Sequence, residues 1–209
     1  MEAVVAVSTD IDVRIDPRQV RELEQLFKNF PGEAKTALFR ATSNTTRFSQ
    51  AEITRQVRKV TTLKVKSIKR RVAVRVKAKR SNPTAAIEIH QKTKRGAGLM
   101  PLLTSFTGTR KPRKSKRYPQ GRGITAKPRI NKQREKWPHG FMITGRGGVP
   151  VPMRRKTRDR YPLVPIRGPS PWGVIAYEKG VYQKLEKAIM KKYEKEIEKR
   201  IIAALRGKG

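Results

Sequence analysis

Positive charge is concentrated in one part of this chain, and that concentration limits how the chain can fold. Residues 53–134 contain 26 Lys and Arg but a single acidic residue, Glu88. Residues 1–52 have a formal charge of −1 and residues 135–209 a charge of +11, within a total of +35. Because like charges repel in a compact state, we expect the middle of the chain to face a polyanion, and the first quarter not to.

The N-terminal part, residues 11–72, has the patterns of a strand followed by helices. Residues 11–16 (IDVRID) alternate apolar and charged side chains, the period of a half-buried strand. A first helix is predicted after Pro17, and Pro31-Gly32 interrupts it. A second helix is predicted from about residue 33 to 60. Small residues dominate its apolar face, so another element should pack closely against it; that face comprises Ala34, Ala37, Leu38, Ala41 and Phe48.

Residues 72–166 are expected to form a small β-sheet. The clearest strands are residues 72–79 (VAVRVKAK) and 85–90 (AAIEIH), and the turn residues between them predict a hairpin. Alternation gives this hairpin an apolar face and a basic face. The apolar face comprises Val72, Val74, Val76 and Ala78. The basic face comprises Arg75, Lys77 and Lys79, which are candidate contacts to phosphate or to an acidic partner.

A long basic loop is predicted within the sheet region, at about residues 96–136. Short strands are expected at GITAK, GFMIT and GVPVPM, and Pro150 and Pro152 predict an edge position for the last. A loop rich in cations supplies charge and reach for phosphate contacts, although a solvated loop without a partner is an equally good interpretation. The candidate contacts in this loop are Arg110, Lys111, Arg113, Lys114, Lys116 and Arg117.

The C-terminal segment, residues 174–206, is predicted to be one long helix. Apolar residues recur every four positions from Val181 to Leu205, and Glu196 and Arg200 form a favourable pair one turn apart. A four-residue spacing drifts around a helix of period 3.6, so one flat surface is too narrow to cover the whole stripe. The proline-rich segment 161–173 (YPLVPIRGPSPWG) precedes this helix.

Catalytic chemistry has little support in the sequence. The chain contains no cysteine and two histidines, His90 and His139, both expected at surface or turn positions. Clustered carboxylates for a metal site are missing from the basic segment. We therefore expect no enzyme activity, no metal and no cofactor. The apolar runs are also too short for a membrane helix, so no membrane association is expected.

Several segments follow one another along the chain in a definite order: EAKTALFRATSNTT, the basic hairpin, PLLTSF, HGFMIT, VPVPMRR and YPLVPIRGPSP. In this order they resemble the phage minor tail protein Z family of siphophage and prophage tail completion proteins. The resemblance covers about residues 11–205. Its most specific part is the succession of the arginine-rich strand, the proline-rich segment and the long helix.

The expected fold is α+β and a single domain over residues 1–209: N-terminal helices and a long C-terminal helix packed on a small, mostly antiparallel sheet. The resemblance implies a structural virion protein at the head-proximal end of the tail. Such a protein completes the tail for head joining and DNA passage, and is present in the host cytoplasm during assembly.

Tail symmetry makes a ring of six copies the natural expectation. The implied partners are further copies of the chain, a tail terminator or tail tube protein, head–tail connector proteins, and genome DNA bound without sequence readout. Within such a ring the proline-rich segment would set the direction in which the last helix leaves. The candidate subunit interface comprises Pro165, Ile166, Pro169, Trp172, Leu185, Ile189, Tyr193, Ile197 and Ile201.

A ribosomal- or nucleoid-type protein that binds RNA or DNA without sequence specificity is the alternative. Size and charge fit this class. It explains less well the nearly neutral first quarter and the apolar, proline-rich segment before the last helix.

Overall fold

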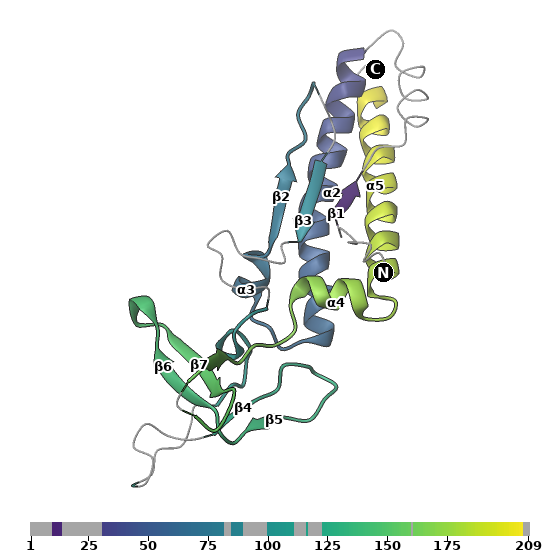
Figure 1. The fold of residues 1–209 in the computed structure, drawn as a ribbon. Helices are drawn as coiled ribbons and strands as arrows, with labels where there is room; N and C mark the ends of the chain where they lie inside the picture. The colour runs from purple at the N-terminus through teal and green to yellow at the C-terminus, as the bar shows by residue number, and fades with distance from the viewer. Residues whose placement is uncertain are drawn as a thin grey trace, which may run out of the picture. The chain divides into compact units, whose positions relative to one another are not determined.

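The computed structural model describes residues 10–13, 31–81, 85–89, 100–110, 116, 123–159 and 161–206. The principal elements of these residues are two long helices and several small antiparallel sheets, which confirms the α+β class (Figure 1). The chain divides into two compact units. Unit 1 comprises Met1–Thr54, Val72–His90 and Glu178–Gly209, and unit 2 comprises Arg55–Arg71 and Gln91–Tyr177. The single domain over residues 1–209 stays a prediction.

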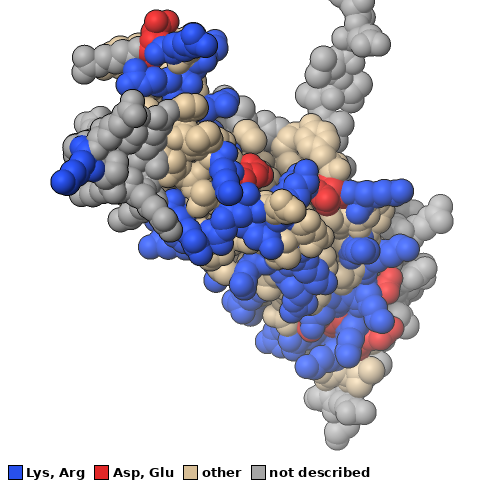
Figure 2. Space-filling view, turned by 90° about the horizontal axis from the view of Figure 1, so that it is seen from below, with Lys and Arg blue, Asp and Glu red and all other residues tan. Residues whose placement is uncertain are grey.

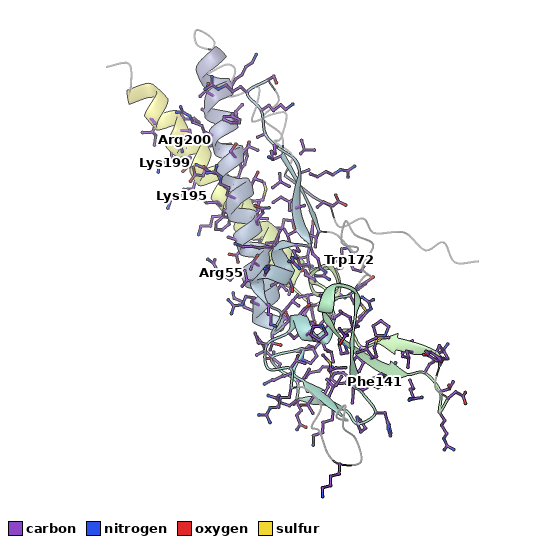
Figure 3. The ribbon with its side chains drawn as sticks, turned by 90° about the vertical axis from the view of Figure 1, so that its left-hand side faces the viewer. Arg55, Phe141, Trp172, Lys195, Lys199 and Arg200 are labelled. Atoms are coloured by element: carbon purple, nitrogen blue, oxygen red, sulfur yellow. The ribbon has the colours of Figure 1, made fainter. Side chains whose placement is uncertain are left out.

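Unit 1 is built around two long helices, α2 (Pro31–Val60, counted in unit 1 as far as Thr54) and α5 (Val181–Arg206). They lie side by side (Figures 1 and 3). The Asn44 amide contacts Glu196, and the Lys192 ammonium lies 5.9 Å from the centre of the Phe48 ring. The contacting residue moves from 44 to 48 along α2 while its partner moves from 196 to 192 along α5, so the two helices are antiparallel.

Small and hydroxylated side chains allow the two helices to approach. Ala41, Thr42, Thr45 and Ser49 of α2 are all fully buried. The Ser49 hydroxyl donates to the Thr45 carbonyl at 2.7 Å, so part of this polar surface is satisfied within the helix. The predicted close packing on the second helix is thus confirmed, although hydroxyls contribute to it as much as alanines do.

A three-stranded antiparallel sheet completes unit 1, with the order β1–β3–β2. Its strands are β1 (Asp10–Val13), β2 (Val72–Val76) and β3 (Ala85–Ile89). The central strand β3 buries alternate residues, and Ile87 faces Ile11 on one side and Val74 on the other. The predicted hairpin and first strand are confirmed. The helix predicted after Pro17 lies outside the described residues.

The apolar face predicted for residues 72–79 ends earlier than the sequence indicated. Val72 and Val74 pair with Ile89 and Ile87, but the register then shifts, and Val76 pairs with Ala86. Arg75 is the extra residue at this irregularity, and an extra residue reverses the side on which later side chains lie. Val76 is accordingly 43% exposed, so its predicted place on the apolar face was wrong.

Unit 2 contains short elements around a compact apolar core. Its elements are α3 (Val65–Lys69), η1 (Leu103–Ser105), β4 (Ile124–Ala126), β5 (Glu135–Trp137), β6 (Phe141–Thr144), η2 (Arg146–Gly148), β7 (Pro150–Arg155), β8 (Leu163–Pro165) and α4 (Pro171–Tyr177). Strand β4 pairs with β5, and β6, β7 and β8 form a second sheet in that order, all antiparallel. Leu63, Ile68, Leu103, Phe106 and Ile124 are fully buried in this unit.

The segment 96–136 is less of a loop than the sequence predicted. Residues 102–106 are tied to the rest of unit 2 because the Lys64 amide donates to the Ser105 carbonyl at 2.9 Å. The β4–β5 hairpin occupies the C-terminal half of the segment. Buried apolar side chains hold both parts in the core. The strand predicted at GITAK is β4, whereas β5 and the burial within residues 102–106 were not predicted, because Gly, Pro and cations surround them.

Strand β7 is central in its sheet, so the edge position predicted from its prolines was wrong. The reason lies in the register. Pro150 and Pro152 pair with β6, whereas pairing with β8 begins only at Met153. The Pro152 carbonyl still accepts a bond from the Ile166 amide at 2.8 Å. Both prolines therefore occupy positions where no second strand requires their missing N–H.

The predicted helix 174–206 is two helices. Helix α4 ends at Tyr177 and α5 begins at Val181, and Gly180 between them has a φ of +74°. That left-handed conformation ends a helix and favours glycine. The predicted drift of the apolar stripe is confirmed within α5. Its residues are fully buried as far as Tyr193, and Ile197 and Ile201 beyond it are only half-buried.

Candidate interaction surfaces

Charge divides unevenly between the two units. Unit 2 contains 30 Lys and Arg and two acidic residues, Glu135 and Asp159. Unit 1 contains 21 Lys and Arg and 14 acidic residues. The formal charges are +28 and +7. Figure 2 shows one face of the molecule on which Lys and Arg greatly outnumber Asp and Glu. The folded chain thus concentrates its positive potential in unit 2.

One basic surface of unit 2 surrounds the short helix α3. Lys64, Lys66, Lys69 and Arg70 are exposed there, and the helix has no acidic residue in its first turn. The Lys64 ammonium donates to the Thr104 carbonyl at 2.9 Å, which fixes its position. None of these four residues is among the candidates predicted from the sequence. Their sequence signal is the acid-free basic run LKVKSIKRR, residues 63–71.

A second basic surface lies at the end of β7, where Arg154, Arg155 and Lys156 are exposed. The Arg155 guanidinium lies 6.0 Å from the centre of the Phe141 ring, which Figure 3 labels, and it donates to the Asp159 carbonyl at 3.2 Å. Contact with a ring face and a carbonyl holds this cation in place without neutralising it.

The predicted phosphate contacts are distributed over both units. Arg75, Lys77 and Lys79 belong to unit 1 and are exposed. Arg110 and Lys116 belong to unit 2 and are exposed as well, and the Arg110 amide donates to the Thr125 carbonyl at 2.8 Å. The other four predicted residues, Lys111, Arg113, Lys114 and Arg117, lie outside the described residues.

Part of the predicted subunit interface is covered by the chain itself. Leu185, Ile189 and Tyr193 are at most 3% exposed within unit 1, and Ile166 is 4% exposed within unit 2. Core packing uses these four side chains in this conformation, and their part in a subunit interface stays a prediction. Half-buried positions remain as candidates: Pro165, Pro169, Trp172, Ile197 and Ile201.

Two aromatic residues of α4 add to the interface candidates. The rings of Trp172 and Tyr177 meet edge to face, with their centres 5.2 Å apart, and Tyr177 is 76% exposed. Figure 3 labels Trp172. Aromatic residues are enriched in protein interfaces, where they bury a large surface area. The contact with Trp172 already positions Tyr177, so binding a partner would cost little side-chain conformational entropy.

A carboxylate joins α2 and α5 inside unit 1. Glu196 accepts hydrogen bonds from the Asn44 amide at 3.0 Å and from the Lys192 ammonium at 2.8 Å. The predicted pair with Arg200 is present at 3.9 Å. The hydrogen bond from Asn44, followed by the one from Lys192, lowers the pKa of Glu196 below its usual value. The carboxylate is therefore stabilised in its charged form between the helices.

The described residues contain no group of three His, Asp or Glu side chains placed to hold a metal ion. Over the same part of the chain, every helix is too short or too polar to cross a membrane.

Comparison with known families gives one match. A family model described as prophage minor tail protein Z matches residues 17–207. Neither the curated proteins nor the solved structures include a significant match to the chain.

Proposed function

The chain belongs to the prophage minor tail protein Z family, and on this premise we propose that it completes the head-proximal end of the tail. Membership makes it a structural protein of the phage tail, and so of the virion. The proposal adds a position and a task. Copies of the chain form a ring that makes the tail competent to join the head and pass DNA, and they do so without catalysing a reaction.

The observation that carries the proposal is the concentration of charge in unit 2. Unit 2 contains thirty cations and only two carboxylates, so most of its positive charge has no counter-charge within the unit. A protein that contacts a DNA channel needs phosphate contacts that are independent of sequence, and exposed Lys and Arg supply them. Acidic surfaces of tail or connector proteins would be attracted to the same residues.

The half-buried end of the α5 stripe supports self-association. Ile197 and Ile201 continue the row of Leu185, Ile189 and Tyr193 beyond the part that the core of unit 1 covers. Apolar side chains at that position gain stability when a second surface removes them from water. We therefore place Ile197 and Ile201 at the contact between neighbouring copies.

The deciding experiment is the mass of the purified chain in solution, at low and high salt, with and without short duplex DNA. A DNA-independent ring, or a monomer that assembles only on tail tubes, is the expected result. Ile201→Glu should reduce assembly, whereas Ile202→Glu should not, because these adjacent residues lie on different sides of α5. A stable monomer whose only strong partner is RNA or DNA, released steeply by salt, would instead favour the ribosomal- or nucleoid-type alternative.

A further inference from the structure

Arg70, Arg71 and Arg167 of unit 2 lie close enough for their charges to interact, and among the described residues no carboxylate charge acts on Arg71. Arg71 follows α3, and only 7% of its surface is exposed. Burial, and then the charges of Arg167 and Arg70, lower the pKa of Arg71. Both effects disfavour the charged form, so the guanidinium is held in an unfavourable field in the free protein.

Firm backbone contacts hold these arginines in position. The Lys64 amide, at the start of α3, donates to the Ser105 carbonyl at 2.9 Å. On the other side of the same segment, the Gly168 amide donates to the Pro101 carbonyl at 2.9 Å. Residues 101–105 thus tie the segment that leads into α3 to the segment that carries Arg167. The cluster is built on the core of unit 2.

The guanidinium groups are oriented by carbonyl oxygens, which leaves their charge uncompensated. One Arg71 nitrogen donates to the Ser67 carbonyl at 3.1 Å, and one Arg167 nitrogen donates to the Met100 carbonyl at 2.8 Å. The Arg71 Nε is buried and has no hydrogen-bond partner among the residues that the structure describes. A buried N–H without an acceptor is costly, so the site lacks at least one acceptor.

Unit 2 has little means of supplying that acceptor as a carboxylate. Its two acidic residues are Glu135, exposed in β5, and Asp159, whose carboxylate accepts a bond from the Thr157 hydroxyl at 3.1 Å. The charges that act on Arg71 are those of two arginines. The described part of unit 2 therefore places no carboxylate where it could serve as that acceptor.

We propose that Arg70, Arg71 and Arg167 form a binding site for a single phosphate group. The planar fork of a guanidinium matches the oxygens of phosphate in pairs, and a doubly charged group balances three cations better than one carboxylate does. Arg70 is exposed and Arg167 half-buried, so an entering anion meets them first, and Arg71 forms the buried side of the site. This inference goes beyond the tail role and is independent of the ring and of the position in the tail.

The test uses the full chain in phosphate-free buffer, titrated with inorganic phosphate and, separately, with chloride at equal ionic strength. Phosphate should raise the unfolding temperature of the unchanged chain far more than chloride does. By calorimetry, Arg167→Gln and Arg71→Lys should each bind phosphate at least tenfold more weakly. The control is Arg47→Gln, which removes an exposed charge from the unit 1 part of α2 and should leave phosphate binding unchanged.

A stability measurement separates a binding site from a purely structural cluster. In phosphate-free, low-salt buffer Arg167→Gln should be at least as stable as the unchanged chain, because it removes a like charge from Arg71. The proposal is overturned if Arg167→Gln loses the same stability with and without phosphate, or if phosphate acts no more strongly than chloride. Arg167→Gln alone decides the question if Arg71→Lys fails to fold.

Short duplex DNA distinguishes two sources of the phosphate group. If DNA displaces inorganic phosphate, and Arg167→Gln weakens DNA binding more than Arg47→Gln does, the site takes a phosphate of a nucleic-acid backbone. If DNA leaves phosphate binding unchanged, the site takes a small phosphate ligand. Both outcomes uphold the site, and its failure to bind inorganic phosphate leaves the proposed tail role untouched.

Discussion

Gly168 lies where the backbone passes directly over the ring of Phe106. A Cβ atom at this position would be 2.5 Å from two ring carbons, and Phe106 is 1% exposed. Gly168→Ala should therefore destabilise the chain by about 1–3 kcal/mol, the usual cost of overpacking a core. Urea unfolding followed by circular dichroism measures the change.

Gly32, near the start of α2, is the matched control. A Cβ atom there would meet nothing within 4 Å, so Gly32→Ala should be neutral or slightly stabilising. An equal loss of stability for both variants would show that the ring of Phe106 is not what excludes a side chain at residue 168.

The folding stability of the chain should depend on pH through Tyr193, and the direction follows from the pKa shift of this residue. Burial raises the pKa of Tyr193 to about 12 from its ordinary 10, against a smaller opposing effect of Thr42. Between about pH 10 and 12 the folded state keeps the phenol proton that the unfolded state has lost. The contribution of protonated Tyr193 to folding stability is therefore fully present below pH 10 and is lost as the pH rises to about 12. The difference amounts to about 3 kcal/mol.

Tyr193→Phe should remove that part of the alkaline destabilisation while leaving stability at pH 7 unchanged or higher. The Tyr193 hydroxyl is buried and has no hydrogen-bond partner among the described residues, so little is lost with it. Tyr182→Phe is the control, because Tyr182 is 39% exposed. Identical unfolding profiles of the two variants from pH 9 to 12 would contradict the assignment.

At the scale of elements, the α5 stripe separates core from interface. Ile189 is 3% exposed, so Ile189→Ala should cost about 2–5 kcal/mol. Ile201 is half-buried, and Ile201→Ala should cost about 1 kcal/mol or less while weakening self-association. Chemical unfolding gives the first quantity and sedimentation gives the second. A large loss of monomer stability with unchanged association in Ile201→Ala would remove Ile201 from the interface.

Helices and strands were predictable where the spacing of apolar residues repeats several times along the element. The second helix, the hairpin and the drift of the α5 stripe follow from residues such as Val72, Ile87 and Leu185, whose spacing states the face they occupy. Breaks in the pattern were not predictable. Arg75 shifts the register through a backbone irregularity that no side-chain pattern encodes, and the position of Pro152 depends on where β8 begins to pair.

The candidate site was predictable in charge but not in place. The charge pattern located the basic segment, and the phosphate contacts predicted from it include the loop around Arg113 but not Lys66, Lys69 or Arg71. Lys66 and Lys69 lie on a helix of five residues and Arg71 follows it, so the segment is too short for a helical period to be recognised. The approach of Arg167 to Arg71 joins residues nearly a hundred positions apart, so only the fold brings them together.

At the scale of the whole molecule, the two units should differ in their contribution to DNA binding. A paired change in unit 2, Lys66→Gln with Lys69→Gln, should lower the dependence of log Kobs on log salt by about 2, roughly 0.9 for each phosphate that is no longer neutralised. The matched pair in unit 1 is Lys195→Gln with Lys199→Gln, two exposed α5 residues labelled in Figure 3. It should leave the slope unchanged. Fluorescence anisotropy with labelled duplex DNA at several salt concentrations measures the slopes.

A third variant tests the predicted contacts of unit 1. Lys77→Gln with Lys79→Gln should reduce the slope if the hairpin meets DNA as the sequence predicts. An equal reduction in all three paired variants would mean that binding follows net charge alone, with no preference for unit 2.

The interleaving of the two units also restricts how the gene can vary. Unit 1 has segments on both sides of each segment of unit 2, and the chain passes between the units after residues 54, 71, 90 and 177. Any single genetic exchange within this coding sequence therefore joins part of one ancestral unit 1 to part of another. Replacing unit 2 alone requires two separate exchanged stretches that spare residues 72–90. The two units should consequently be inherited together more often than they would be if each were one continuous segment of the chain.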